Sequence, residues 1–213
     1  MKPRHLSLLL GLGLILATQS PAEAQAWFFP DFALPSPSDT PATWIGATYG
    51  RGLNDYSGKA DAFGVSLGHS SGRTTFMGVF GHRTEGDGEF TAGASMAVDL
   101  NSGEGTRFSF QTGVGWIDFD FLDEKVTFWR VPIGIAVKGI LGSESTKVRP
   151  WVMPRVNIAF APGAGESETE TNFGGSGGLA VTTASGFGFH TALDALFEDG
   201  EAAWILGLGI HYV

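Results

Sequence analysis

From Trp44 onward, bulky apolar residues alternate with small or polar ones in short runs, which clusters of Gly, Ser, Asn and Asp separate. An alternation with a period of two is typical of β-strands whose two faces meet different surroundings. Most runs reach the roughly 9 to 11 residues that a tilted strand needs to cross a bilayer. We expect ten strands, near residues 44–52, 61–70, 73–83, 89–100, 106–118, 126–141, 147–161, 174–183, 186–197 and 203–213.

The two faces of these runs indicate where the strands lie. In the second run Phe63, Val65 and Leu67 alternate with Gly64 and Ser66. The small face lacks the Lys and Glu of a strand that meets water, which favours lipid outside and a narrow polar interior. The pattern therefore predicts an all-β fold, a single antiparallel up-and-down transmembrane β-barrel of eight to ten strands, with ten preferred.

The connections predict a sidedness for this barrel. Even-numbered runs pass to odd-numbered ones through tight turns, whereas the opposite connections are generally longer, the longest being 162–173. Short periplasmic turns and long external loops are usual for such barrels, and they place both chain ends in the periplasm. The external loops are expected to be acidic, and acidic mouths attract cations. The acidic loop residues are Glu85, Asp87, Glu89, Glu166, Glu168 and Glu170.

The N-terminal segment predicts export. Lys2 and Arg4 precede an apolar stretch over 6–17, and Ala22 and Ala24 form a small-x-small cleavage site. We divide the chain into a signal peptide at 1–24, a proline-rich linker at 25–43 and an outer-membrane β-barrel at 44–213. The expected location is the outer membrane of a Gram-negative-type bacterium, with outer-membrane lipid as partner.

Two sets of side chains are singled out inside and outside the barrel. Aromatic rings prefer the membrane–water interface, so lipid-facing belts are predicted at Trp44, Trp116, Trp129, Trp204 and Tyr212. A polar network in the lumen is predicted from Asp99, Gln111, Arg155 and His190. Asp118 and His82 are further candidates for the interior, where charged groups either pair and hold the lumen shut or form a protease-like site.

Composition excludes several functions. The formal net charge of −9 disfavours nucleic acid, which requires a basic stripe. With no cysteine, disulfides, thiol nucleophiles and zinc–thiolate sites are excluded. No two histidines are two residues apart on a strand, which disfavours a histidine metal site. The acidic runs 85–89 and 166–170 match no EF-hand and are interpreted as solvated loops rather than Ca²⁺ or Mg²⁺ sites. No cofactor is expected.

The pattern of residues 44–213 and the closing run WILGLGIHYV resemble the small outer-membrane β-barrel proteins, the class that includes outer membrane protein A-like and porin-family barrels. In those proteins the last strand is a signal for the barrel-assembly machinery and usually ends on an aromatic residue. Here Tyr212 is penultimate and Val213 is last. The resemblance implies that this machinery is a partner during biogenesis.

These observations predict an integral outer-membrane protein that is not an enzyme, with a structural, adhesive or narrow, cation-preferring pore role. A barrel-borne lipid-modifying or proteolytic enzyme is the first alternative. Its one weak signal is His69-Ser70-Ser71, which loosely resembles the His-x-Ser arrangement of outer-membrane lipid A deacylases. The second alternative is a soluble periplasmic lipocalin-like carrier, whose bulky faces would point inward around an apolar ligand.

Overall fold

The computed structural model describes residues 36, 38, 40–57, 59–84, 89–102, 105–121, 124–161, 168–198 and 200–213. The prediction for 1–24 and most of 25–43 lies outside these residues. The strands are β1 (Ala42–Gly52), β2 (Asp61–Ser71), β3 (Thr74–Arg83), β4 (Glu89–Asp99), β5 (Arg107–Phe121), β6 (Glu124–Lys138), β7 (Leu141–Gly142), β8 (Thr146–Ala161), β9 (Glu168–Thr183), β10 (Phe187–Glu198) and β11 (Glu201–Tyr212). A single 3₁₀ turn, η2 (Asp55–Ser57), follows β1. No helix in the described part of the chain is long and apolar enough to span a membrane.

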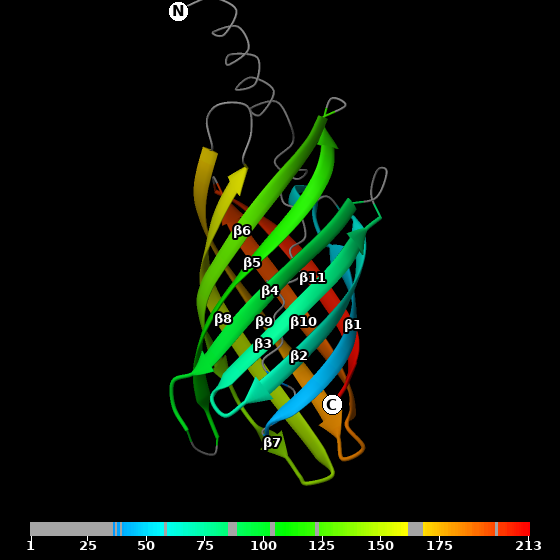
Figure 1. The fold of residues 1–213 in the computed structure, drawn as a ribbon, viewed down its shortest axis with the longest axis vertical. Helices are drawn as coiled ribbons and strands as arrows, with labels where there is room; N and C mark the ends of the chain where they lie inside the picture. Colours follow the sequence, from blue (N-terminus) through cyan, green and yellow to red (C-terminus); the bar gives the residue numbers. More distant parts are fainter. Residues whose placement is uncertain are drawn as a thin grey trace, which may run out of the picture.

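Ten strands form a closed antiparallel ring (Figure 1), as the alternation predicts. Consecutive strands pair from β1 to β6, and β11 to β8 continue on the other side of β1. Pairing of β6 with β8 completes the ring, and β7 is a two-residue strand in the turn between them. The seam between the first and last strands runs from Ile45 opposite Tyr212 to Gly52 opposite Ile205. Every strand of the ring therefore has a neighbour on both sides, so no ladder edge is left open.

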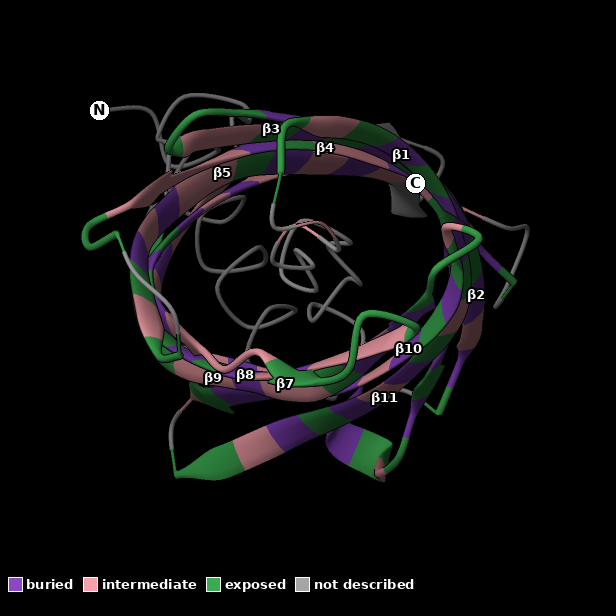
Figure 2. Ribbon diagram, turned by 90° about the horizontal axis from the view of Figure 1, so that it is seen from below, coloured by how far each residue is buried: buried purple, intermediate pink, exposed green. Residues whose placement is uncertain are grey.

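Side chains alternate between the two faces of the wall, as the change of burial along each strand shows (Figure 2). Outward positions are apolar, and Phe63, Val65 and Leu67 of β2 are more than half exposed. The adjacent residue Ala62, which faces inward, is fully buried. Buried polar residues occupy the inward positions of the same sheet, among them Gln111, Arg155 and His190. The barrel is thus apolar outside and polar inside, the reverse of a soluble barrel.

Two prolines interrupt the ladder without shifting it. Pro132 lies in β6 and Pro154 in β8, where the sequence predicts that a bulge absorbs the lost hydrogen bond. The β6–β8 register has the same offset at Gly134 opposite Arg155 as at Val137 opposite Val152. No extra residue is inserted between these pairs, so the bulge prediction is wrong: the strands pass the prolines in register.

The connections do not show the predicted difference in length. In Figure 1 the C-terminus lies at the lower end of the barrel, and we use "lower" and "upper" in that sense. Upper connections include two-residue ones between β5 and β6 and between β10 and β11, while the lower connections at 100–106 and 139–145 are longer. The strands themselves extend further at the upper end, since β9 begins at Glu168 and not near residue 174. Acidic and polar residues that resemble a loop in sequence are here the ends of paired strands.

Trp44 is the clearest error among the predicted belts. Its side chain points inward and is 1% exposed. Gly68 on β2 lies opposite it in the register, and a Cβ there would fall within the indole ring. The absence of a side chain at Gly68 leaves space for a large ring on the lumen face, so packing overrides the preference of tryptophan for the membrane interface.

We expect Gly68→Ala to destabilise the barrel by about 1–3 kcal/mol, because the added methyl group must displace the ring of Trp44. Gly78→Ala is the matched control: a Cβ at Gly78 has no atom within 4 Å, and loss of a glycine from a strand is neutral or mildly stabilising. Urea unfolding of both variants in detergent micelles measures the difference. Equal stabilities would show that Trp44 is not held against Gly68.

Candidate functional site

Three groups of polar side chains stand out among the described inward positions of the lumen. The first lies at the lower end, around Asp99 of β4. Its carboxylate accepts hydrogen bonds from Ser109 on β5 at 2.6 Å and from Lys138 on β6 at 2.8 Å, and Arg107 lies 3.9 Å away. Gln111, two positions above Ser109, also faces inward and is buried. This group links three consecutive strands near the lower mouth.

The second group is a buried ion pair in the upper half of the barrel. Arg155 of β8 donates two hydrogen bonds to Asp194 of β10, at 2.6 and 2.9 Å, and a third from Nε to the side-chain oxygen of Asn157 at 3.0 Å. The two charged side chains are 0% and 2% exposed. A bidentate pair of this kind compensates the desolvation of both charges only while both partners are present.

The third group is a chain of hydrogen bonds around two histidines. His190 of β10 bonds through Nε2 to the hydroxyl of Thr48 at 3.0 Å, and its Nδ1 lies 3.4 Å from Nδ1 of His211 on β11. His211 bonds through Nε2 to the hydroxyl of Thr182 at 2.9 Å, which also accepts from Arg149 at 3.3 Å. Five side chains from five strands are thus joined along the lumen wall.

The four predicted lumen residues therefore all face inward, but they belong to separate groups. Sequence reasoning missed the partners that hold them, namely Lys138, Asp194 and His211. Asp194 was within reach, because it lies at the same strand parity as His190 and Ala192. The pairings themselves depend on the register between strands, which no local pattern contains.

Two further candidates for the interior lie on the outer face. His82 of β3 packs its ring against Phe90 of β4, with centroids 4.8 Å apart. Asp118 of β5 accepts a hydrogen bond from Thr127 of β6 at 2.6 Å, again on the outward parity. The prediction of an interior Asp/His arrangement with these residues is wrong. His69 also faces outward, bonded to Thr43 at 2.8 Å, while the adjacent Ser70 is buried on the inward face.

The other predicted belt residues face outward. Trp204 packs edge-on against Phe197 near the upper end, with ring centroids 6.3 Å apart. Trp129 stacks on Phe160 at 6.4 Å in the same region, and Trp116 lies beside it in the register. Tyr212 is exposed at the lower end. Outward aromatic rings thus occur toward both ends of the wall.

The acidic loop residues divide into two sets. Glu85, Asp87 and Glu166 lie outside the described residues. The other three are in strands: Glu89 begins β4, and Glu168 and Glu170 lie in β9. Glu89 turns inward and forms an ion pair with the buried Arg83 at 3.4 Å. For Glu168 and Glu170 the prediction of a loop is wrong, because the upper end of β9 pairs further than expected, while Glu89 begins the strand that the sequence predicts at 89–100.

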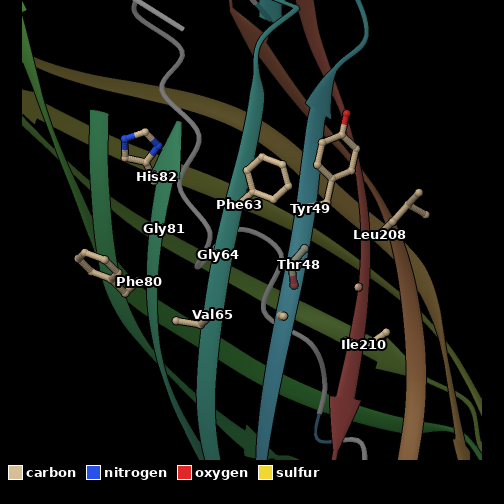
Figure 3. A pocket seen from close by; sticks show the side chains of 12 residues that line it. Thr48, Tyr49, Phe63, Gly64, Val65, Phe80, Gly81, His82, Leu208 and Ile210 are labelled. Carbon is tan, nitrogen blue, oxygen red and sulfur yellow. The ribbon is translucent and has the colours of Figure 1, made fainter. Parts of the chain in front are cut away.

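The described outer wall carries a hollow of about 460 Å³ (Figure 3). It spans β11, β1, β2 and β3, and Gly64, Gly81 and Gly209 contribute backbone only to its lining. Its upper margin carries Tyr49 and His82, and the Tyr49 hydroxyl donates to Asp61 at 2.7 Å. Among the described residues no group of three or more His, Asp or Glu side chains is placed to share a metal ion, here or in the lumen.

Comparisons with known proteins agree on the architecture. The chain matches no protein-family model and no curated protein sequence. Solved structures of similar fold include the N-terminal β-barrel domain of Pseudomonas aeruginosa OprF, with 12% identity, TM-score 0.36 and coverage of 80% of this chain and 95% of that chain. The Yersinia pestis outer membrane protein Ail has 12% identity, TM-score 0.37 and coverage of 82% and 100%. The outer-membrane enzyme PagL has 10% identity, TM-score 0.41 and coverage of 79% and 98%.

At these identities the similarity concerns the fold alone. The resemblance to small outer-membrane β-barrels is confirmed at that level, and the chain is a closed antiparallel ten-stranded barrel. One prediction is overturned. The prediction that the protein is not an enzyme does not stand, because the solved barrels of this fold include an outer-membrane enzyme.

We expect Asp194→Asn to destabilise the barrel by about 3–5 kcal/mol, because it removes the negative charge to which the fully buried Arg155 guanidinium donates two hydrogen bonds. Asp61→Asn is the matched control, since the pair of Asp61 with Arg51 is largely exposed, and we expect a loss of about 0–1 kcal/mol there. Unfolding free energies of both variants in the same detergent test this. Similar losses in the two variants would contradict the burial of the Arg155 pair.

Proposed function

We propose that the chain is an integral outer-membrane protein with a structural role at the cell surface, a barrel that anchors its upper connections in the membrane while its lumen stays closed. The observation that carries the first half of this proposal is the sidedness of the wall. Large apolar side chains on outward positions of every part of the ring are exposed, among them Ile45, Phe80, Leu193 and Leu208. An outward apolar surface that continues around the whole ring is typical of a barrel that lies in lipid.

The same sidedness argues against the lipocalin-like carrier. That alternative requires the bulky residues to surround an internal ligand. Here the inward positions hold charged pairs, histidines and small residues beside a few large apolar side chains such as Trp151 and Met153. Phe63, Val65 and Leu67 point away from the lumen. A soluble form of this barrel would expose its entire apolar band to water.

The lumen supports a closed barrel at rest. Inward side chains such as Trp44, Trp151, Met153 and Arg155 are at most 5% exposed. Two pairs of inward charges, Lys138 with Asp99 and Arg155 with Asp194, are joined by short hydrogen bonds. These contacts support an anchor whose function is carried by its outer surfaces.

A narrow pore is the second candidate, and the direction of the contacts favours it. The hydrogen bonds of the lumen join strands two apart in the ring, β4 with β6, β8 with β10 and β10 with β1. These hydrogen bonds therefore run along the wall rather than across the lumen. Among the described inward charges that are buried or half-buried, seven are basic and four are acidic: Arg83, Arg107, Arg130, Lys138, Lys147, Arg149 and Arg155 against Glu89, Asp99, Asp194 and Glu198. A pore lined in this way prefers anions, whereas the acidic loops alone had suggested cations.

We expect Leu67→Arg to lower the stability of the membrane-inserted barrel by about 2–4 kcal/mol, because Leu67 lies near the middle of β2 on the outward face. His69→Arg, two residues closer to the lower end on the same face, is the control, with an expected cost of about 0–1 kcal/mol. Folding into phospholipid vesicles, followed by heat-modifiable gel migration, measures both. If Leu67→Arg were tolerated and the protein fractionated with the soluble periplasm, membrane insertion would be excluded.

Planar-bilayer recordings distinguish the anchor from the pore. We expect the wild-type barrel to show no stepwise conductance, because its inward side chains are buried and paired. The double variant Arg155→Ala with Asp194→Ala removes the central ion pair, and we expect it to open a measurable conductance. Steady channels formed by the wild-type protein would contradict the closed lumen. A reversal potential in a KCl gradient that indicates anion selectivity would then support the function as a pore.

A further inference from the structure

The two lumen histidines belong to a repeated tripeptide. Gly188-Phe189-His190 lies in β10 and Gly209-Ile210-His211 in β11. The antiparallel register sets His190 opposite Gly209 and His211 opposite Gly188. Each histidine therefore faces the glycine of the other segment, and the four residues are related by a local two-fold arrangement in the lumen wall.

The glycines are required by this arrangement. A Cβ at Gly209 would collide with Nε2 of His190, and a Cβ at Gly188 would collide with Nε2 of His211. Each imidazole thus lies flat over the neighbouring glycine and reaches the threonine on the strand beyond it. His190 reaches Thr48 and His211 reaches Thr182, at 3.0 and 2.9 Å. The symmetry of the histidines extends to the groups that orient them.

The remaining nitrogens of the two rings face each other. Nδ1 of His190 and Nδ1 of His211 are 3.4 Å apart, which is long for a hydrogen bond donated by nitrogen. Two nitrogens bound to one tetrahedral ion at about 2.0–2.1 Å lie roughly 3.3–3.4 Å apart. The separation of the two Nδ1 atoms is therefore at the long end for an N–H···N hydrogen bond, and it equals that of two nitrogens on one tetrahedral ion.

The threonines supply the outer contacts that a metal-binding histidine needs. A ligating imidazole commonly donates its other N–H to an oxygen, which fixes its tautomer and its orientation. The hydroxyls of Thr48 and Thr182 are placed to accept from the two Nε2 atoms, since either atom of each bond can be the donor. With both Nε2 atoms protonated, both Nδ1 lone pairs point into the space between the rings.

We propose that His190 and His211 form a lumen-facing site for a divalent transition-metal ion, bound through the two Nδ1 atoms with solvent completing the coordination. Imidazole nitrogen suits Zn²⁺, whose tetrahedral geometry the separation matches; Cu²⁺ binds the same donors, with a tetragonal preference, and serves as the spectroscopic probe. The sequence analysis disfavours such a site because no two histidines are close along a strand. Pairing across strands supplies the proximity that spacing along the chain does not.

The test is a titration of Cu²⁺ into the full-length folded protein in detergent, followed by electron paramagnetic resonance. We expect one ion per chain, with hyperfine splitting from two equivalent imidazole nitrogens. His190→Gln and His211→Gln should each weaken binding at least about tenfold and remove the two-nitrogen signature. His69→Gln and His82→Gln, on the outer face, are matched controls and should leave both unchanged.

Thr48→Val and Thr182→Val test the orienting contacts. Each keeps both histidines and the size of the side chain, and we expect about 10- to 100-fold weaker binding with the two-nitrogen signal retained at saturation. Heat-modifiable migration verifies that each variant is folded. If a histidine variant fails to fold, the wild-type spectrum and the threonine variants still decide whether the two histidines bind the metal ion. Absence of the two-nitrogen signal, or binding unchanged by either histidine substitution, overturns the site whether or not the barrel conducts.

Discussion

The structure depends on the pairing of its first strand with its last. The β1–β11 ladder, together with the β6–β8 ladder on the far side, leaves no strand of the ring with an unpaired edge. In a hydrocarbon environment each unsatisfied backbone group costs several kcal/mol, so closure is the condition for a strand-built wall there. Once the ring is closed, strand parity assigns every side chain to the lumen or to the outside.

That assignment explains what the sequence could predict. The period of two located all ten strands and the apolar outer band, because lipid on one side and a narrow interior on the other impose different residue types at successive positions. Leu67 and Ile210 follow this rule, since both are apolar and lie on outward positions. The prediction failed where a residue was assigned to a face of the wall by its type and not by its strand parity. Trp44 was assigned to a belt because it is a tryptophan, although it lies on the inward parity with Gly46 and Thr48.

The candidate site was less predictable than the fold. Arg155 and His190 were recognised as interior groups, but Asp194 and His211 reach them across intervening strands, so their proximity depends on register. The upper strand ends were also missed, since acidic residues such as Glu170 resemble a solvated loop until a paired neighbour is known. One local signal was available and not used, the repetition of Gly-x-His in the last two strands.

The bond between Thr48 and His190 has a kinetic consequence. It joins residues 142 positions apart and crosses the seam, because His190 lies on β10 and Thr48 on β1, with β11 between them. It can form only after the ends of the chain have met, and such distant contacts are the slowest to develop during folding. The local two-fold arrangement of histidines over glycines, in contrast, needs only the β10–β11 hairpin. We therefore expect the imidazole pair to assemble before the barrel closes, and the bond of one of its rings to the first strand to form only on closure.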